Sequence, residues 1–378
     1  MRPHLSLLLL SAATALAVDG QTPLKLKPAN STLSAEFTGV TSLRELSDGR
    51  VIIGDGRDQT LWVADFTTDR TEPIGRKGRG PGEYTFVGWV RPIGGDSSLM
   101  GDILQRRWLV LNGARLVGVV PPDHPAVAKT HGSVSFADRR GYVLFLRPIA
   151  EKAGVSEIST SDSTAVELIS RNTGKVDTVS MLRPLPRRRT IAYGPDGRIT
   201  SSSSRVIDLW AREESAILLP DGSLAVVRLD PLRVDWRSPD GVWRLGRPLP
   251  VKPLRLDQRE RDGINARRTA AGSVVMRSTR GGERLSSSPP LTEFPPFLPL
   301  IAMEPATLVS ASGQVLIRRN LSVALPGTRY LVVNRKGTLD GELVLGDKAY
   351  IRGFGSKSVY VVTVDDDDIQ HMSRHPWP

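Results

Sequence analysis

The fold is decided by residues 215–247, which read SAILLPDGSLAVVRLDPLRVDWRSPDGVWRLGR. Four β-rich runs lie at 215–219, 224–229, 232–237 and 242–247. Two of the turns between them are Pro-Asp-Gly, and Asp-Gly suits a tight hairpin because both central residues of such a turn need positive φ. Four antiparallel strands joined by short turns form one blade of a β-propeller.

Similar groups of four short runs recur along the chain, with turn residues about every 8 to 12 positions, as in all-β sandwiches, barrels and propellers. The groups span residues 40–75, 87–120, 133–181, 215–247, 306–345 and 350–373. The last group is one strand short. Because a propeller must cover the open sheet edge at its seam, we expect Pro23 to Ala35 to supply that strand. The sequence therefore predicts an all-β fold, a six-bladed β-propeller closed by an N-terminal strand.

Two stretches lie outside this rhythm. Residues 184–210 carry Arg187-Arg188-Arg189 and four consecutive serines, and we interpret them as a long polar connection. Residues 255–300 form a partly helical and proline-rich insertion, with a helix expected over Asp257 to Ala271. The prolines at 289–296 fix φ and remove amide donors, so the second half is predicted to be a rigid surface path and not a strand.

The N-terminus has the three parts of a signal peptide: Arg2, an apolar run from Leu5 to Val18, and small residues ending at Ala17. The alternative is a membrane anchor, but the run is shorter than the roughly 20 apolar residues that span a bilayer. We predict a signal peptide over residues 1–17, cleavage near Ala17, and a single propeller domain over residues 18–378. The mature protein is expected to be periplasmic or secreted, with no membrane span.

Composition excludes some chemistry. The chain has no cysteine, which excludes disulfides, thiolate metal sites and a cysteine nucleophile. The net charge of +11 comes from 41 Arg and 10 Lys against 40 acidic residues. Such a protein could bind polyanions, but the interpretation that we favour is an arginine-biased composition spread over the surface. No basic helix or nucleic-acid motif is present, so we expect no nucleic-acid partner.

The residues at 46–55, Asp65 and the turn Gly80-Pro81-Gly82-Glu83-Tyr84 resemble the opening repeats of bacterial exported six-bladed β-propeller proteins related to the NHL-repeat group. Residues 224–228, 234–236 and 239–241, and the proline-phenylalanine segment at 294–297, add to the resemblance, which touches most of the mature chain. The resemblance implies a fold and an exported location. It implies no particular reaction.

In a propeller, connections between blades and the loops between second and third strands emerge on one face, here called the loop face. Loops on such rigid scaffolds carry function. The loop face is predicted to collect residues 55–59, 76–83, 102–107, 148–164, 183–210, 255–300, 320–327 and 365–368. The candidate ligand-binding residues on it are Asp55, Arg76, Lys77, Arg79, Glu83, Asp102 and Arg106.

The run at 75–82 is glycine-rich and basic, so its amides could form a nest for an anion. The alternative, which we favour, is a turn that leads the chain from one blade to the next. Likewise, the three carboxylates Asp55, Glu83 and Asp102 could serve a metal, or could pair with Arg76, Arg79 and Arg106. We favour the pairing.

Near the C-terminus, Asp365 to Asp368 lack the spacing of a calcium loop, and we interpret them as a solvated turn. His371 and His375 have poor metal geometry on a strand, and we interpret them as rim residues. No catalytic residue and no metal ligand is therefore predicted.

The sequence favours an exported binding module, without enzyme activity, that recognises an anionic ligand, a glycan or a partner protein on its loop face. We expect a monomer without a cofactor. The alternative is a metal-dependent propeller hydrolase or lyase, similar to lactonases, with calcium or zinc in the channel. That alternative needs three or four carboxylates or histidines that converge on one point.

Overall fold

The computed structural model describes residues 23–80, 82–147, 157–159, 163–193, 199–270, 274–277, 283–286, 289–303 and 307–377. The predicted signal peptide, residues 1–17, lies outside the described residues. No helix in the described part of the chain is long and apolar enough to cross a lipid bilayer.

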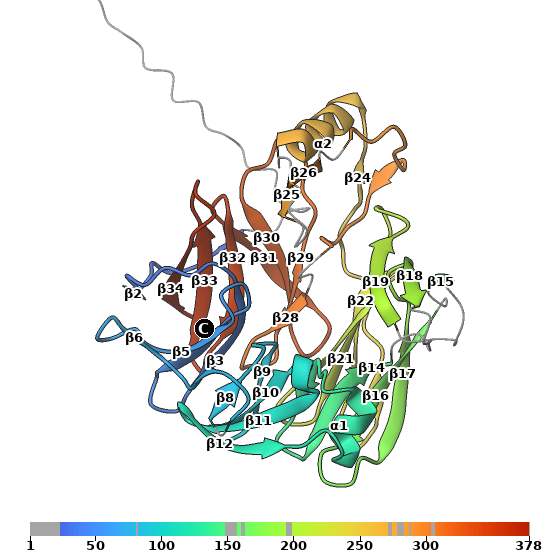
Figure 1. Cartoon of the computed structure of the whole chain (residues 1–378). Coiled ribbons are helices and arrows are strands. Elements are labelled where there is room, and N and C mark those ends of the chain that lie inside the picture. Colours follow the sequence, from blue (N-terminus) through green and yellow to red (C-terminus); the bar gives the residue numbers. More distant parts are fainter. Residues whose placement is uncertain are drawn as a thin grey trace, which may run out of the picture.

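The chain folds into a six-bladed β-propeller (Figure 1). Each blade is built on four antiparallel strands. These are taken in chain order, except that β15 (Glu157–Ser159) of another sheet lies between the second and third strands of blade 3, and that one strand of the last blade comes from the N-terminus. Blade 1 contains β3 (Val40–Glu45), β4 (Val51–Asp55), β5 (Thr60–Asp65) and β6 (Arg70–Pro73). Blade 2 contains β9 (Val90–Gly94), β10 (Ser97–Asp102), β11 (Arg107–Asn112) and β12 (Arg115–Val120). Blade 3 contains β13 (Phe136–Ala137), β14 (Tyr142–Leu146), β16 (Thr164–Ser170) and β17 (Val176–Leu182).

The fourth blade is the stretch that decides the fold: β20 (Ser215–Leu218), β21 (Leu224–Leu229), β22 (Leu232–Arg237) and β23 (Trp243–Arg244). Blade 5 contains β28 (Thr307–Val309), β29 (Val315–Arg318), β30 (Thr328–Val333) and β31 (Leu339–Leu345). Blade 6 contains β32 (Ala349–Phe354), β33 (Ser358–Val364), β34 (Gln370–Pro376) and, from the N-terminus, β2 (Ser31–Thr32). The six predicted groups of strands are confirmed.

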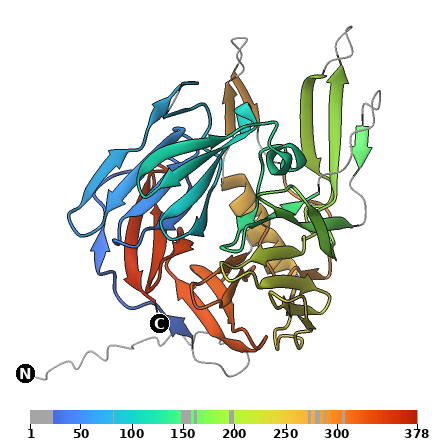
Figure 2. The ribbon, with the colours of Figure 1, turned by 90° about the horizontal axis from the view of Figure 1, so that it is seen from below.

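The ring closes as the sequence predicts. In blade 6, β2 pairs antiparallel with β34, with Ser31 opposite Arg374. The pairing is extended by the amide of Leu33, which donates to the carbonyl of Met372 at 3.0 Å. A further N-terminal strand, β1 (Leu24–Lys25), pairs parallel with β31 of blade 5. The first strands form the inner ring, in which each contacts the first strand of the next blade and β32 contacts β3 (Figure 2).

Buried side chains fill the spaces between neighbouring blades. Each main apolar cluster draws on two of them: one combines Val51 and Ile53 of blade 1 with Tyr360 and Met372 of blade 6. Buried tyrosine hydroxyls also join blades, because Tyr360 donates to Glu45 at 2.5 Å. This face-to-face packing of sheets removes apolar surface from water and makes the ring of blades one rigid scaffold.

The loop face carries the elements that lie outside the blades. Before blade 3 they are the parallel pair β7 (Arg76–Lys77) and β8 (Glu83–Tyr84), the 3-10 turn η1 (Ile103–Gln105) and α1 (Pro125–Thr130). A three-stranded sheet consists of β15 (Glu157–Ser159), β18 (Arg187–Tyr193) and β19 (Ile199–Val206). The insertion contains α2 (Gln258–Ala270), the pair β24 (Leu254–Arg255) and β27 (Phe297–Leu298), and the hairpin β25 (Val274–Arg277) and β26 (Glu283–Ser286).

Two expectations about these elements are wrong in part. Residues 184–210 are not a plain polar connection, because β18 and β19 form a long hairpin in which Thr190 lies opposite Ser203. Backbone pairing does not require apolar side chains, so arginines and serines can extend a sheet. In the insertion, the predicted helix is confirmed as α2. The proline-rich half was predicted to hold no strand, but Phe297 and Leu298 keep their amides and pair with β24.

Candidate functional site

Asp55, at the end of β4, is a buried carboxylate with both oxygens occupied. Its side chain accepts hydrogen bonds from the amides of Thr38, Gly39, Arg57 and Asp58 at 2.8 to 3.2 Å. The residue is 1% exposed. Burial by itself would raise the pKa of Asp55, but the hydrogen bonds from these four amides hold that pKa below its usual value. Asp55 therefore organises the turn after β4 and the entry into blade 1.

Asp102 occupies the equivalent position at the end of β10 and is fully buried. Its carboxylate accepts hydrogen bonds from the hydroxyl of Thr85 at 2.6 Å and pairs with the guanidinium of Arg107 at 3.0 Å. The predicted candidate Arg106 is not the partner. Arg106 is exposed, and its guanidinium lies 2.8 Å from the ring Nδ1 of His131.

The glycine-rich loop at 75–82 surrounds the carboxylate of its own neighbour, Glu83. Oε2 of Glu83 accepts from the amide of Gly80 at 2.7 Å, and Oε1 accepts from Nε of Arg76 at 2.7 Å. These two hydrogen bonds lower the pKa of Glu83. A Cβ on Gly78 would lie 2.1 Å from Glu83 Oε2, so the loop has closed tightly on this anion.

The remaining cations of that loop, Lys77 and Arg79, are exposed. No side-chain hydrogen bond or ion pair joins either of them to a residue that the structure describes.

The acidic run near the C-terminus is a turn. Asp365 accepts from the amides of Asp367 and Ile369 at 2.9 Å, and its other oxygen lies 2.9 Å from Nε2 of His371. His375 contacts Ser373 and the carbonyl of Lys27. Within the described ranges, no group of three or more His, Asp or Glu side chains is placed to hold a metal ion.

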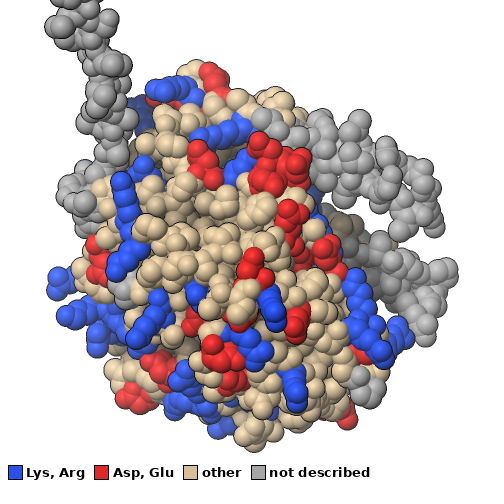
Figure 3. Space-filling model, turned by 90° about the vertical axis from the view of Figure 1, so that its left-hand side faces the viewer, with Lys and Arg blue, Asp and Glu red and all other residues tan. Residues whose placement is uncertain are grey.

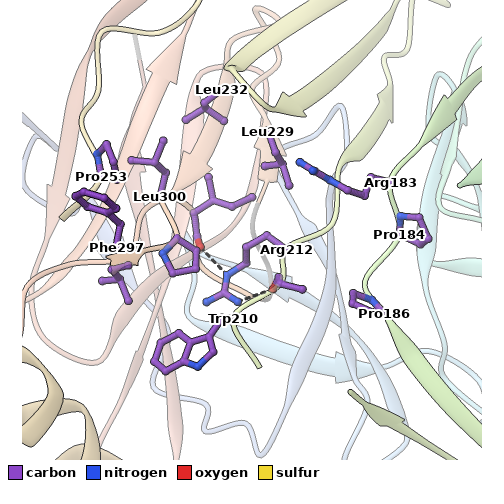
Figure 4. Close-up of a pocket in the computed structure, with 14 residues that line it drawn as sticks. Arg183, Pro184, Pro186, Trp210, Arg212, Leu229, Leu232, Pro253, Phe297 and Leu300 are labelled. Atoms are coloured by element: carbon purple, nitrogen blue, oxygen red, sulfur yellow. Dashed lines mark hydrogen bonds between the residues drawn. The ribbon is translucent and has the colours of Figure 1, made fainter. Parts of the chain in front are cut away.

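The site that the geometry favours is a pocket of about 560 Å³ on the loop face, between blades 3, 4 and 5 (Figure 4). Its walls come from the connection between blades 3 and 4, the second turn of blade 4 and the insertion. Most of the lining is apolar or proline; the residues are Arg183, Pro184, Pro186, Trp210, Ala211, Arg212, Leu229, Leu232, Pro253, Phe297, Leu298, Pro299, Leu300 and Ile301. The volume falls within the usual range for small-molecule sites.

Arg212 is the main polar group of this pocket. Its Nε donates to the carbonyl of Ile301 at 2.9 Å, and Nη1 donates to the carbonyl of Ala211 at 2.6 Å (Figure 4). Nη1 also donates to the carbonyl of Leu209 at 3.0 Å. No described carboxylate pairs with it. Burial lowers the pKa of Arg212, and the nearby charge of Asp208 opposes that shift. The carbonyls fix the orientation of the guanidinium and leave its charge without an ion-pair partner among the described residues.

Arg183 adds a second cation at the opposite wall, where its side chain extends toward Leu229 (Figure 4). Its guanidinium makes no hydrogen bond or ion pair with a described residue. The carboxylate of Glu214 is already engaged: its Oε2 accepts from the backbone amide of Arg183 at 3.1 Å and from Nη1 of Arg228 at 2.8 Å.

The aromatic side of the pocket is held by the insertion. Trp210 donates from its indole nitrogen to the carbonyl of Glu293 at 3.2 Å and packs against Phe294 with ring centroids 5.3 Å apart. The guanidinium of Arg261 in α2 lies over the same Phe294 ring. The helix and the proline-rich path of the insertion therefore hold one wall of the pocket in place.

Sequence reasoning placed residues 183–210 and 255–300 on the loop face, but these ranges leave out Arg212, and none of the lining residues was singled out. Arginine is so frequent in this sequence that neither Arg183 nor Arg212 stands out. The neighbouring residues in the sequence do not show that the guanidinium of Arg212 binds backbone carbonyls and not carboxylates. On the face that Figure 3 shows, basic and acidic side chains are interspersed and mark no single site.

No family model matches this chain, and no curated protein matches its sequence. Solved structures of similar shape include a member of the duf4221 family from Bacteroides vulgatus, at 11% identity and TM-score 0.44, over 92% of this chain and 97% of that one. Another is the calcium-binding protein regucalcin from Agrobacterium tumefaciens, at 9% identity and TM-score 0.38, over 95% and 97%. A third is an inactive form of virginiamycin B lyase from Staphylococcus aureus, at 9% identity and TM-score 0.40, over 92% and 98%. The six-bladed architecture of this chain rests on its own strand pairing.

Proposed function

We propose that this protein is an exported binding module that uses the pocket between blades 3, 4 and 5 to recognise a ligand with an apolar body and one anionic group. The observation that carries the proposal is the pair Arg183 and Arg212, two cations without a described acid partner on apolar walls. Arg212 is half-buried, so water screens its charge less than that of a surface cation and it attracts an anion more strongly. Arg183 is exposed and adds a second positive charge at the rim. Arginine is also suited to carboxylate, sulfonate and phosphate groups through its planar set of donors.

The walls support the apolar part of the ligand. Trp210 and Phe297 offer aromatic surface, and Phe297 is 49% exposed, while prolines and leucines complete the lining. Apolar walls with a few fixed polar groups are the usual composition of small-molecule sites. In this arrangement the apolar walls supply affinity, and Arg212 selects for a negative group.

A matched pair of fluorescent probes tests the proposal: 8-anilino-1-naphthalenesulfonate, and N-phenyl-1-naphthylamine, which lacks the sulfonate. Each is titrated into the chain without residues 1–17. We expect Arg212→Gln to weaken binding of the sulfonate about tenfold, the usual effect of losing a hydrogen bond to a charged group. Binding of the neutral probe is expected to change little. Phe297→Ala should weaken both.

Arg70→Gln is the control, because Arg70 is exposed on β6 of blade 1, away from the pocket, and the substitution removes the same charge. It is expected to bind both probes like the wild type. Equal losses for the two probes in Arg212→Gln, or no loss for either, would contradict the proposal. Circular dichroism of each variant shows that the propeller is intact.

A further inference from the structure

The walls of the pocket between blades 3, 4 and 5 have another property in common: many of their hydrogen-bonding groups are missing or already used. Four of the lining residues are prolines, which have no amide donor; they are Pro184, Pro186, Pro253 and Pro299. Phe297 and Leu298 pair with β24. The indole nitrogen of Trp210 donates to a carbonyl of the insertion. The walls therefore offer a ligand few hydrogen-bond donors besides the two arginines.

Carbonyl groups of the walls are engaged in the same way. Asn320 binds three of them in succession. Its Nδ2 donates to the carbonyls of Pro299 at 2.8 Å and Ile301 at 2.7 Å, and its backbone amide donates to the carbonyl of Leu300 at 3.1 Å. The carbonyl of Leu232 accepts from another backbone amide at 2.8 Å. An amide or hydroxyl of a ligand would leave water here without gaining a partner, which is unfavourable. The body of the ligand is therefore expected to be a hydrocarbon.

One nitrogen of Arg212 remains available for the anionic end of the ligand. Nε and Nη1 donate to backbone carbonyls, whereas Nη2 makes no hydrogen bond with a described residue. Nη2 is not fully buried, so a ligand can reach it. A carboxylate matches the single charge of this guanidinium, and a hydrogen bond between two charged groups is stronger than a neutral one.

Apolar surface continues from the pocket to the outside. Phe297, in the wall, is 49% exposed. Leu209, which is 39% exposed, directly precedes Trp210 of the wall. Ile207 is 47% exposed, and its amide donates to the carbonyl of Pro186, also of the wall, at 2.9 Å. Exposed apolar side chains that adjoin one another in this way are typical of binding grooves. A ligand that covers them must be elongated.

We propose that the ligand is a fatty acid with a long, unbranched acyl chain. Its carboxylate binds Nη2 of Arg212, and its chain crosses the pocket and leaves it over Leu209 and Ile207. This inference rests on the proposed function, because it assigns a ligand class to the same pocket. An acyl chain has no polar group that these walls would leave without a partner, and each methylene group that leaves water adds to the affinity.

Calorimetric titration of the chain without residues 1–17 tests the ligand class, with octanoate, decanoate and dodecanoate, each below the concentration at which it forms micelles. We expect each added pair of methylene groups to tighten binding several-fold, with an upper limit of about fifteenfold, since burying one methylene gives about fourfold. The comparison ligand is the N-acetylated dipeptide of two leucines, which carries a free carboxylate and two amides. It should bind at least about tenfold more weakly than dodecanoate.

The path of the chain is tested with the double variant Ile207→Ser and Leu209→Ser. It should lower the ratio of dodecanoate affinity to octanoate affinity, because the outer methylene groups lose their apolar contacts. The control is the double variant Val117→Ser and Val119→Ser on β12 of blade 2, where the two valines are exposed to a similar extent. The control should keep the wild-type ratio. An unchanged ratio in the first double variant would overturn the proposed path.

Two results in the wild type, which need no variant to fold, would overturn the fatty-acid assignment. They are dodecanoate that binds no more tightly than octanoate, and a dipeptide that binds as tightly as dodecanoate. If the sulfonate probe still binds in a manner that depends on Arg212, only the ligand class is wrong and the proposed function stands. If the sulfonate probe fails as well, both are overturned.

Discussion

The loop face contains two regions that differ in whether their charged side chains have partners within the chain. At blades 1 and 2, the carboxylates of Asp55, Glu83 and Asp102 accept hydrogen bonds from amides, hydroxyls and guanidinium groups of their own neighbourhood. At the pocket between blades 3, 4 and 5, Arg212 is bound only by carbonyls and Arg183 has no described partner for its guanidinium. The carboxylates of the first region have partners within the chain, whereas the two cations of the second have no acid partner among the described residues.

This difference shows why the type of residue alone does not identify a binding site. A charged group that its own chain has satisfied stabilises the fold, because an outside ligand would have to replace bonds that already exist. A charged group that is oriented but not neutralised can bind a ligand at little cost. The comparison predicts that substitutions at blades 1 and 2 affect mainly stability, while those at the pocket affect mainly binding.

The largest loss of stability is expected for Asp102→Ala. The substitution leaves Arg107, whose side chain is 13% exposed, without its partner, and leaves the hydroxyl of Thr85 without an acceptor. Breaking a buried ion pair by removing one member is unfavourable by about 3 to 5 kcal/mol. Urea denaturation measures the change. Asp102→Asn is the control and should lose less, because its amide oxygen can still accept from Thr85.

A smaller loss, about 2 to 3 kcal/mol, is expected for Asp55→Ala, because four backbone amides lose their acceptor but no buried cation is left unpaired. Urea denaturation again gives the value. A change of less than about 0.5 kcal/mol would show that water replaces the carboxylate, and would break the comparison.

The pH dependence of stability at the same position sharpens this test, with Asp55→Asn as the variant. Because the folded pKa of Asp55 is lowered, its ionised form stabilises the fold above the unfolded pKa of about 3.9. That contribution is lost as pH falls through the folded pKa. The difference in stability between wild type and Asp55→Asn should therefore be constant near neutral pH and shrink below about pH 4.

The smallest effect is expected for Glu83→Gln. Its partner Arg76 has a side chain that is 81% exposed, and exposed ion pairs contribute little in water. A glutamine side chain at this position would still offer an oxygen to the backbone amide of Gly80. Thermal melts should show a smaller change than for either aspartate. Salt at 0.5 M, which shortens the Debye length to about 4 Å, should reduce the change further. A melting temperature as low as that of Asp102→Ala would show that the loop depends on the anion of Glu83.

Much of the fold could be predicted because residues close together in the sequence determine its strands and turns. Each blade is a series of hairpins, so alternation and turn residues such as Pro239-Asp240-Gly241 mark its strands locally. The closing strand followed from counting, since five complete groups and one incomplete group leave a strand edge to cover. The hairpin of β18 and β19 was missed because arginine and serine give no apolar alternation, although their backbones pair as well as others.

Two of the candidate residues, Asp55 and Asp102, lie at the ends of second strands, but their partners could not be seen in the sequence. Asp102 pairs with Arg107 and not with the adjacent Arg106, because Arg106 takes a left-handed conformation at the end of the 3-10 turn η1 and points elsewhere. Arg106 and Arg107 are adjacent in the sequence, yet only the side chain of Arg107 faces the carboxylate of Asp102.

By itself, the sequence determined the number of blades, the strand that closes the ring and the face on which the long loops gather. These follow from local hydrogen-bonding patterns and from the need to cover a sheet edge. Only the tertiary structure decided which charges are neutralised. Arg212 meets the carbonyl of Ile301, which lies 89 residues further along the chain, and no local pattern encodes such a contact. Whether a charge stabilises the fold or remains available to a ligand depends on such distant neighbours.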